Sequence, residues 1–279
     1  MKSILVLEGG ALRGIYTAGV LDVLLDNNIE VDAVVGVSAG ALFGINYVSK
    51  QRGRCLRYNL ANVHNKDYMG FHSLLKTGDI MNEEFCFHKL IYETDPFDFK
   101  TFNKSKIKFY AVVTNLRTGE PEYKKIDDIE KDMEYLRASG SMPLVSRNVK
   151  IGKEEYLDGG MSDSIPIKWA EEQGYDKIIV VETRPKTYRK KKSTIAPYKL
   201  KYKKYPKFIE TISARWKNYN ETKDYIEKKD NIVVIRPTRL VKIKRIEKNK
   251  DKIQEMYDLG VEDAKNKIKE IKKYLGKKG

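Results

Sequence analysis

A serine between two glycines is the residue of this 279-residue chain best suited to covalent chemistry. The run Gly36-Val37-Ser38-Ala39-Gly40 follows an apolar stretch, Val31–Val37, and precedes a helix-compatible one, Ala39–Val48. A strand that turns sharply into a helix raises a serine hydroxyl above the sheet, and flanking glycines avoid side-chain clashes in such a turn. The pattern therefore predicts that Ser38 is a nucleophile for acyl transfer, with Gly36 and Gly40 shaping its turn.

A second glycine-rich turn lies near the start of the chain. The apolar run Ser3–Leu7 leads into Glu8-Gly9-Gly10-Ala11-Leu12-Arg13-Gly14, and a helical pattern follows. Free N–H groups at such a turn suit a negative oxygen, so the loop could cradle a phosphate or form an oxyanion hole; a plain turn with Arg13 in solvent is the third interpretation. The loop matches neither G-x-G-x-x-G nor a phosphate loop ending in G-K-[ST]. Its coexistence with Ser38 favours the oxyanion hole.

A serine nucleophile needs a base, and the histidines are poorly placed to supply one. The chain contains only His64, His72 and His88. In the usual α/β-hydrolase order of serine, acid and histidine, the triad would have to finish by residue 88, which leaves room for only a stunted fold. The run Asp158-Gly159-Gly160 offers a carboxylate that could act on the serine directly. An ordinary Asp-Gly hairpin turn explains that run equally well, so the residues alone leave both interpretations open.

Together these runs resemble the patatin-like phospholipase family. G-G-A-L-R-G, G-V-S-A-G and D-G-G follow the order of that family's motifs, with D-G-G replacing the commoner D-G-A, over about residues 1–185. Two further stretches, Val113–Gly119 and Ala138–Pro143, also look familial. The resemblance implies that Ser38 is the nucleophile and Asp158 the base. It also implies an oxyanion hole and motif glycines at the following positions: Gly9, Gly10, Ala11, Arg13 and Gly14 in the loop, and Gly36, Gly40, Gly159 and Gly160 around the dyad.

The function implied by the resemblance is that of a serine lipid acyl hydrolase. It would be of phospholipase A, lysophospholipase or esterase type, acting through an acyl-enzyme on a phospholipid or another acyl ester, with no cofactor. The alternative is a non-catalytic binding protein on the same fold, associated with a membrane or with nucleic acid. The motifs leave the acyl position, the headgroup and the oligomeric state open.

The elements that would position these residues alternate between strand and helix. After the opening β-α-β-α pattern, further elements are expected at Ile107–Val113, Tyr123–Ile126, Lys177–Glu182 and Asn231–Ile235 as strands, and at Ile129–Ala138 and Pro166–Glu172 as helices. Such an order predicts a three-layer α/β/α fold with a mainly parallel central sheet, plus a helical basic annex at the C-terminal end. Both glycine turns would then lie at the carboxyl edge of that sheet, where ligands bind in open α/β folds.

Composition limits the remaining possibilities. Two cysteines, Cys55 and Cys86, are too few for a disulfide scaffold, and with the histidines they show no zinc-binding spacing. No stretch approaches the ~20 apolar residues that span a membrane. A strand beginning at residue 3 leaves no room for a signal peptide. We therefore expect a cytoplasmic protein without a metal, possessing either no membrane contact or a peripheral one.

Charge divides the chain near residue 185. Residues 185–279 hold 30 Lys and Arg against 12 Asp and Glu, a net of +18, so residues 1–184 carry −3 of the total of +15. We predict a catalytic domain at 1–185 and a basic region at 186–279 that is partly packed on the core. Lys186–Lys192 is expected to be a mobile surface loop. Lys250–Leu275 is expected to be a helix with this apolar stripe: Ile253, Met256, Tyr257, Val261, Ala264, Ile268, Ile271 and Leu275.

The basic region has three interpretations. It is a solvated face of a structural annex, a surface that contacts anionic lipid headgroups, or a surface that binds the phosphates of nucleic acid. Each Lys or Arg near an anionic membrane contributes ~1 kcal/mol to attachment. An enzyme that must reach ester bonds in a bilayer gains from such a surface, so peripheral contact with an anionic membrane is the favoured functional interpretation. Nucleic acid is not an expected partner.

Overall fold

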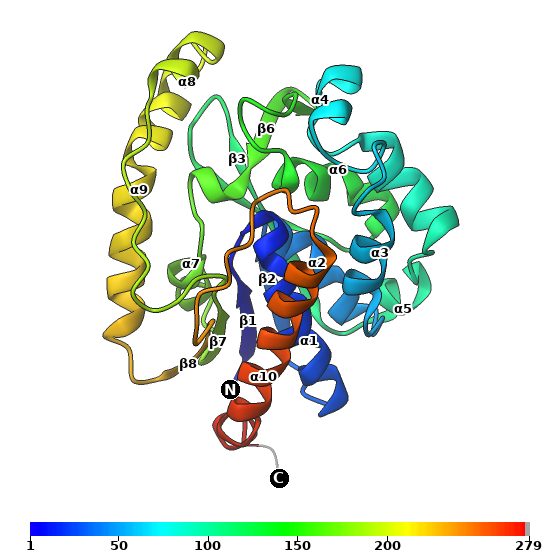
Figure 1. Cartoon of the computed structure of the whole chain (residues 1–279). Helices are drawn as coiled ribbons and strands as arrows, with labels where there is room; N and C mark the ends of the chain where they lie inside the picture. Colours follow the sequence, from blue (N-terminus) through cyan, green and yellow to red (C-terminus); the bar gives the residue numbers. More distant parts are fainter. Residues whose placement is uncertain (277–279) are drawn as a thin grey trace.

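The computed structural model describes residues 1–276, and an eight-stranded sheet lies at its centre (Figure 1). Residues 277–279, the end of the predicted basic region, lie outside the described residues. The sheet order is β5-β6-β3-β2-β1-β7-β8, and β4 also pairs with β3. The strands are β1 (Ser3–Leu7), β2 (Ala33–Val37), β3 (Lys108–Asn115), β4 (Pro121–Lys125), β5 (Val149–Ile151), β6 (Glu154–Asp158), β7 (Lys177–Val181) and β8 (Ile232–Ile235).

The sheet is mixed, with a parallel centre and antiparallel pairs toward one end. The pairs β1–β2, β1–β7, β2–β3 and β7–β8 are parallel, which confirms the predicted mainly parallel sheet. The strand predicted at Tyr123–Ile126 is β4, which forms an antiparallel hairpin with β3. The antiparallel hairpin β5–β6 was not predicted, because its strands are short and carry polar, half-buried side chains such as Glu154 and Glu155.

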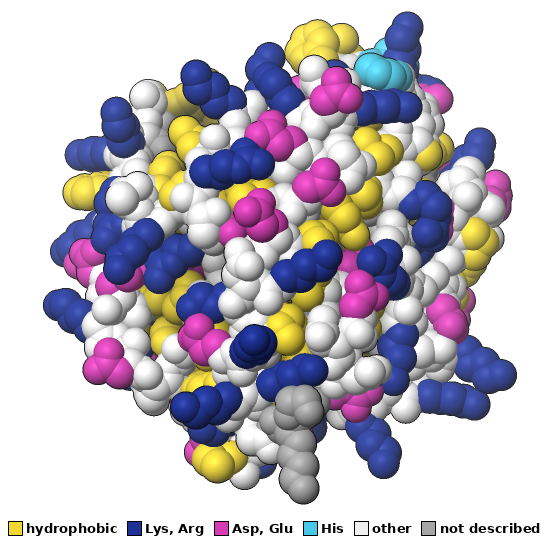
Figure 2. Space-filling model, turned by 60° about the horizontal axis from the view of Figure 1, so that its bottom comes forward, with side chains coloured by type: hydrophobic (Ala, Val, Ile, Leu, Met, Phe, Trp, Pro, Cys, Tyr) yellow, Lys and Arg dark blue, Asp and Glu magenta, His cyan; other side chains and the backbone are white. Residues whose placement is uncertain are grey.

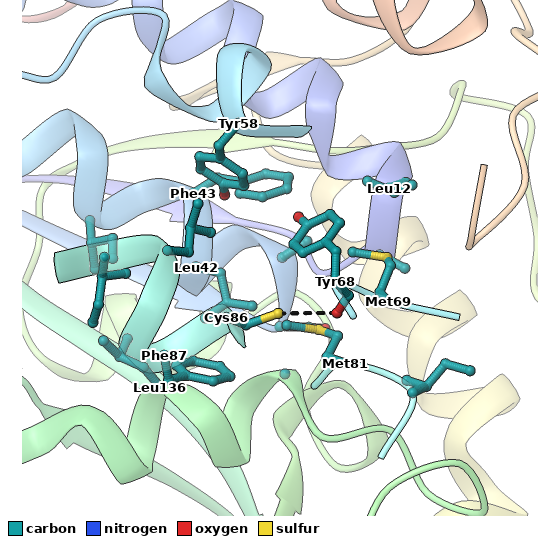
Figure 3. A pocket seen from close by; sticks show the side chains of 18 of the residues that line it. Leu12, Leu42, Phe43, Tyr58, Tyr68, Met69, Met81, Cys86, Phe87 and Leu136 are labelled. Atoms are coloured by element: carbon teal, nitrogen blue, oxygen red, sulfur yellow. Dashed lines mark hydrogen bonds between the residues drawn. The ribbon is translucent and has the colours of Figure 1, made fainter. Parts of the chain in front are cut away.

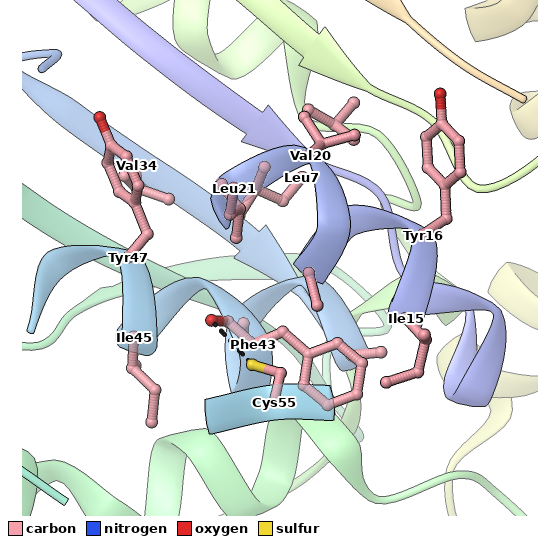
Figure 4. Packing of buried hydrophobic residues seen from close by; sticks show 14 of the residues in the cluster. Leu7, Ile15, Tyr16, Val20, Leu21, Val34, Phe43, Ile45, Tyr47 and Cys55 are labelled. Carbon is pink, nitrogen blue, oxygen red and sulfur yellow. Dashed lines mark hydrogen bonds between the residues drawn. The ribbon is translucent and has the colours of Figure 1, made fainter. Parts of the chain in front are cut away.

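Helices cover both faces of the sheet, giving the three layers. Alternate residues of a strand point to opposite faces. Leu5 and Leu7 of β1 join the larger core cluster, and Ile4 and Val6 join the one on the other face. Figure 4 shows Leu7 and Val34 packed against side chains of the helices that follow β1 and β2. The helical elements are η1 (Ala11–Gly14), α1 (Ile15–Asp26), α2 (Ala39–Val48), α3 (Arg54–Asn62), α4 (Phe71–Thr77), the π-helix η2 (Phe85–Thr94), α5 (Phe99–Lys104), α6 (Ile129–Gly140), η3 (Gly159–Met161), α7 (Ile167–Glu172), α8 (Ala196–Lys201), α9 (Pro206–Glu227) and α10 (Lys250–Tyr274).

The basic region contributes two long helices and a strand to this architecture. Helix α10 confirms the predicted C-terminal helix, and most of its stripe is buried, including Ile253, Met256 and Ile271. Helix α9, which was not predicted, packs Tyr219 and Ile226 on the opposite face of the sheet. Strand β8 extends the sheet beside β7. The proposed domain boundary at residue 185 stays a prediction.

Neither cysteine is paired, and the described helices include none that could cross a bilayer. Cys55 and Cys86 are buried free thiols, and burial raises the pKa of both. Within residues 1–276, every helix is either too short or too polar to span a membrane.

Helices α1 and α10 approach each other closely enough for their backbones to touch, and this contact can be tested. A Cβ added at Gly260 would lie 2.1 Å from the carbonyl oxygen of Tyr16, and one added at Gly19 would lie 2.3 Å from that of Tyr257. Gly260→Ala should therefore force the helices apart and lower the free energy of unfolding by about 1–3 kcal/mol, despite the better helix propensity of alanine. Urea denaturation measures this, with the exposed Lys265→Ala as the control. Equal stability of the two variants would contradict the contact.

Candidate active site

Ser38 occupies a strained turn between β2 and α2. Its backbone adopts φ 55° and ψ −122°, a left-handed φ that is uncommon for a non-glycine residue. The turn is pressed against the neighbouring strand, since a Cβ added at Gly40 would lie 2.4 Å from the carbonyl oxygen of Leu7. The main-chain N–H of Ser38 donates to Ser139 Oγ at 2.9 Å, which fixes the turn from α6. This is the strand–turn–helix context that the sequence predicted.

Asp158 lies at the end of β6, within hydrogen-bonding distance of Ser38. Ser38 Oγ donates to Asp158 Oδ2 at 2.7 Å, although the residues are 120 positions apart in the chain. The other carboxylate oxygen, Oδ1, accepts the N–H of Gly160 at 2.7 Å. Thr114 Oγ1 donates to the main-chain oxygen of Asp158 at 2.9 Å. Both carboxylate oxygens therefore have defined partners, and the one facing Ser38 can accept its proton.

The two further stretches that looked familial brace this pair. Ser139, from Ala138–Pro143, holds the Ser38 main chain, and Thr114, from Val113–Gly119, holds that of Asp158. Gly159 allows the approach of β3, because a Cβ there would lie 2.2 Å from the carbonyl oxygen of Val112. The sequence indicated these stretches without indicating what they hold.

The glycine loop lies directly against Ser38. A Cβ added at Gly9 would lie 3.0 Å from the Cβ of Ser38, and one added at Gly14 would lie 2.7 Å from the Cβ of Ala39. Among the described residues, the N–H groups of Leu12 and Arg13 have backbone acceptors, and those of Gly9 and Gly10 have none. Ala11 begins the short helix η1 with φ 50°. The loop thus brings unpaired N–H donors beside the serine, as an oxyanion hole requires.

Electrostatics at Asp158 combine burial with nearby positive charge. Burial raises the pKa of the Asp158 carboxyl, while the hydrogen bonds from Ser38 and Gly160 and the charges of Arg215 and Lys190 oppose that rise. A carboxylate with a raised pKa is a stronger base than an exposed aspartate. The environment therefore favours proton acceptance from Ser38.

Two pockets of opposite character meet at Ser38. The apolar pocket, with a volume of about 90 Å³, is lined mainly by aliphatic and aromatic side chains from α2, α6 and η2. Figure 3 shows Leu42, Phe43, Phe87 and Leu136 around it. The cationic pocket, of about 500 Å³, contains both Ser38 and Asp158 in its wall. Eight basic residues line it, and we define it by five of them, Arg13, Arg184, Lys190, Arg215 and Arg245. The other three are Lys191, Lys192 and Arg189, which pairs with Asp224.

The sequence did not predict the cationic pocket, and the place of Lys190 in it corrects one sequence prediction. Lys190, expected in a mobile surface loop, lines the pocket, and its main-chain N–H and C=O both bond to the side chain of Asn220 on α9. Arg13 also lines this pocket instead of pointing into solvent. Arg215 belongs to no motif. A detectable signal was its position on a helix that begins at Pro206, three residues after Ile212 and four before Tyr219.

Histidine side chains lie away from both pockets. None of His64, His72 and His88 is among the residues that line either pocket. Across residues 1–276, no group of three or more His, Cys, Asp or Glu side chains is arranged to hold a metal ion.

Comparisons with known proteins identify two matching sequence families. A family model described as patatin-like phospholipase matches residues 5–170, and a domain of unknown function, DUF6363, matches residues 205–276. The uncharacterized protein YjjU of Escherichia coli is 28% identical over 187 residues, 65% of this chain and 52% of that protein. Lysophospholipase nte1 of Aspergillus fumigatus is 28% identical over 188 residues, 64% of this chain and 12% of that protein. "Probable lipid hydrolase 463L" of Invertebrate iridescent virus 6 is 25% identical over 207 residues, 66% of this chain and 71% of that protein. The chain thus spans about half of YjjU and a small part of the lysophospholipase.

The raised pKa of Asp158 predicts a pH-dependent effect on stability. Because the folded-state pKa lies above the unfolded one, the contribution of Asp158 to stability is greatest at low pH and is lost as pH rises through the folded-state pKa. Asp158→Asn should therefore gain stability relative to the parent protein between pH 4 and pH 8, as measured by urea denaturation.

Asp128 provides a control of opposite sign. It caps α6, and its hydrogen bond with Lys131 is the main cause that lowers its pKa. Asp128→Asn should lose stability relative to the parent as pH rises through the lowered folded-state pKa toward the ordinary aspartate value of ~3.9, with little change above about pH 5. The effect of burial on Asp158 would be contradicted if the difference in unfolding free energy between Asp158→Asn and the parent did not change with pH. It would also be contradicted if that difference changed in the same direction as for Asp128→Asn.

Proposed function

Because this chain belongs to the patatin-like phospholipase family, we propose that it is a serine acyl hydrolase that cleaves lipid esters through a Ser38–Asp158 dyad. The observation that carries the proposal is the 2.7 Å hydrogen bond from Ser38 Oγ to Asp158 Oδ2, in a strained turn beside unpaired N–H groups. Two relatives named as a lysophospholipase and a probable lipid hydrolase support the same class of reaction.

Acylation begins with attack of Ser38 Oγ on the ester carbonyl carbon. As the new C–O bond forms, the hydroxyl proton passes to Asp158 Oδ2, and the carbonyl oxygen becomes an oxyanion. The N–H groups of Gly9, Gly10 and Ala11 stabilise that oxyanion. The ester C–O bond then breaks, and the departing alcohol oxygen takes the proton from Asp158, leaving an acyl-enzyme.

Deacylation repeats these steps with water. Asp158 accepts a proton from the water that attacks the acyl carbonyl, and the same N–H groups stabilise the second oxyanion. When the bond to Ser38 breaks, Asp158 returns the proton to the serine oxygen, and the fatty acid leaves. Arg13 and Gly14 complete the loop that positions the donors.

The apolar pocket is the proposed binding site for the acyl chain. It opens at Ser38 and continues between buried side chains of α2, α6 and η2, with few polar groups in its wall. Away from the end that it shares with Ser38 and Arg245, its wall contains Arg54, whose guanidinium is paired with Asp95 and Asn46. A fatty acyl chain placed there would exchange water for apolar contacts.

Peripheral membrane contact remains part of the proposal. Helices α4 and α8 lie at the end of the molecule toward which β1 runs (Figure 1). Helix α4 exposes Phe71 and Leu75, and helix α8 exposes Leu200. On the face in Figure 2, Lys and Arg are spread out with Asp and Glu between them. The apolar side chains, with basic neighbours such as Lys76 and Lys199, support a contact at the end that holds Ser38.

The dyad predicts the effect of two substitutions. Ser38→Ala should reduce hydrolysis of a p-nitrophenyl ester by more than about 1000-fold and abolish labelling by a fluorophosphonate probe, because the nucleophile is removed. Asp158→Asn should reduce turnover by about 100- to 10,000-fold, because the base is removed. Ser213→Ala, at an exposed serine of α9, is the control and should retain activity. Full activity of Ser38→Ala would disprove the assignment, and an unlabelled parent protein would favour the non-catalytic alternative.

The apolar pocket predicts a dependence on acyl-chain length. Each buried CH₂ contributes about 0.8 kcal/mol, so kcat/KM should rise about three- to fourfold per carbon from acetyl toward octanoyl esters until the pocket is filled. Leu136→Trp should flatten this increase by filling the pocket, whereas Leu136→Met, which nearly conserves volume, should retain it. An unchanged chain-length series in the tryptophan variant would place the acyl chain elsewhere.

A further inference from the structure

The cationic pocket holds more positive charge than its own carboxylates can balance. Within residues 1–276, none of its five defining side chains forms an ion pair within 4.0 Å. Its wall contains two carboxylates, Glu8 and Asp158. Asp158 accepts from Ser38 and Gly160, while Glu8 accepts from Thr183 and the Tyr219 hydroxyl. The pocket therefore presents a net positive surface beside the dyad.

Arg215, Lys190 and the main chain at Arg245 are held in place by the surrounding structure. Arg215 Nε donates to the carbonyl oxygen of Gly160 at 2.5 Å, two residues after Asp158. The ammonium of Lys190 lies 4.0 Å from the centre of the Tyr219 ring, and its main chain is fixed by Asn220. The main-chain oxygen of Arg245 accepts the N–H of Leu12, which ties that segment to the glycine loop. These contacts come from separate parts of the chain and converge on one cavity.

One guanidinium nitrogen in the pocket lacks a partner. The Nε of Arg13 is buried and has no hydrogen-bond acceptor among the described residues. A buried donor that loses water without gaining an acceptor is costly, so an anionic oxygen in the pocket would satisfy it. The unpartnered Arg13 Nε therefore indicates a ligand with hydrogen-bond acceptors and negative charge.

Repulsion between the cations agrees with this interpretation. Burial, followed by the charge of Arg215, lowers the pKa of Lys190 to about 7. Burial, followed by the charges of Arg184 and Arg245, lowers the pKa of Arg13 to about 10. Bound anionic charge would offset both causes and favour the protonated forms. Guanidinium and ammonium groups also supply the donor geometry that phosphate oxygens accept.

The arrangement of the two pockets assigns the two sides of the substrate. Both pockets include Ala11, Ser38, Met142 and Arg245 in their walls. An ester carbonyl at Ser38 with its acyl chain in the apolar pocket therefore directs its alcohol part into the cationic pocket. In a phospholipid that part carries the phosphate.

We propose that the cationic pocket binds the phosphate of the substrate headgroup, so that the preferred substrates are acyl esters whose alcohol part carries a phosphate with no compensating cation. The assignment rests on the proposed acyl hydrolase activity. A phosphate monoester or a phosphoglycerol headgroup fits this description. A phosphocholine headgroup does not, because its ammonium would enter a cavity that already repels cations.

The test compares headgroups on monomeric substrates. Dihexanoyl lipids bearing phosphate, phosphoglycerol or phosphocholine are used below their critical micelle concentrations, so that recruitment to a charged surface makes no contribution. The parent protein should show kcat/KM at least about tenfold higher for the two anionic lipids than for the choline lipid. Lys190→Gln and Arg245→Gln, on separate segments, should each reduce that ratio about tenfold, as expected for the loss of a charge-assisted hydrogen bond. Lys265→Gln, at an exposed lysine of α10 outside the pocket, should leave the ratio unchanged.

Further measurements distinguish failure of the headgroup proposal from failure of the hydrolase proposal. If p-nitrophenyl hexanoate is hydrolysed through Ser38 but the three lipids react equally, the headgroup assignment is wrong and the hydrolase assignment stands. If inorganic phosphate inhibits the neutral ester without any headgroup preference, the pocket is a free-anion site and the headgroup assignment is again overturned. If no ester is hydrolysed and Ser38 is not labelled, both proposals fail. If both glutamine variants fold and keep the preference for anionic headgroups, the headgroup assignment is also overturned.

Discussion

The burial of one carboxylate determines most of what surrounds it. Asp158 is a buried residue whose Oδ2 lies 2.7 Å from Ser38 Oγ, and a buried charge is unfavourable unless its oxygens have partners. The Gly160 N–H and the Ser38 hydroxyl provide those partners, and Arg215 and Lys190 provide opposite charge. The glycines around the site follow from the same requirement, because donors reach a buried carboxylate only where backbones approach closely.

The parallel centre of the fold and the dyad were predictable from local sequence. A buried strand that ends in Ser38, and a glycine loop after Ser3–Leu7, must share the carboxyl edge of a parallel sheet, whatever follows later in the chain. The place of Asp158 was not determined by this argument. It depends on an antiparallel strand, β6, whose pairing with β3 brings residue 158 opposite Val113. The resemblance to a known family supplied that residue where spacing alone left a hairpin turn equally plausible.

The cationic pocket could not be predicted, because it is assembled from segments that carry no common motif. Arg13 comes from the glycine loop, Lys190 from the segment after β7, Arg215 from α9 and Arg245 from the segment before α10. Counting charges along the chain indicated that residues 186–279 are basic without distinguishing solvated lysines from those that face Ser38. The distinction depends on α9, where Tyr219, Asn220 and Asp224 contact the 189–190 segment. Arg215 of the same helix reaches the carbonyl oxygen of Gly160.

The proposed headgroup site and the base are also coupled through charge. The same cations that would bind a phosphate oppose the rise of the Asp158 pKa caused by burial. A phosphate bound among Lys190 and Arg215 would offset their field at the carboxylate, and the pKa of Asp158 would rise further. Under the headgroup proposal, the aspartate becomes a stronger base when an anionic substrate is in place. The basic residues of the C-terminal region would then contribute to the reaction at the dyad as well as to any attraction toward a membrane surface.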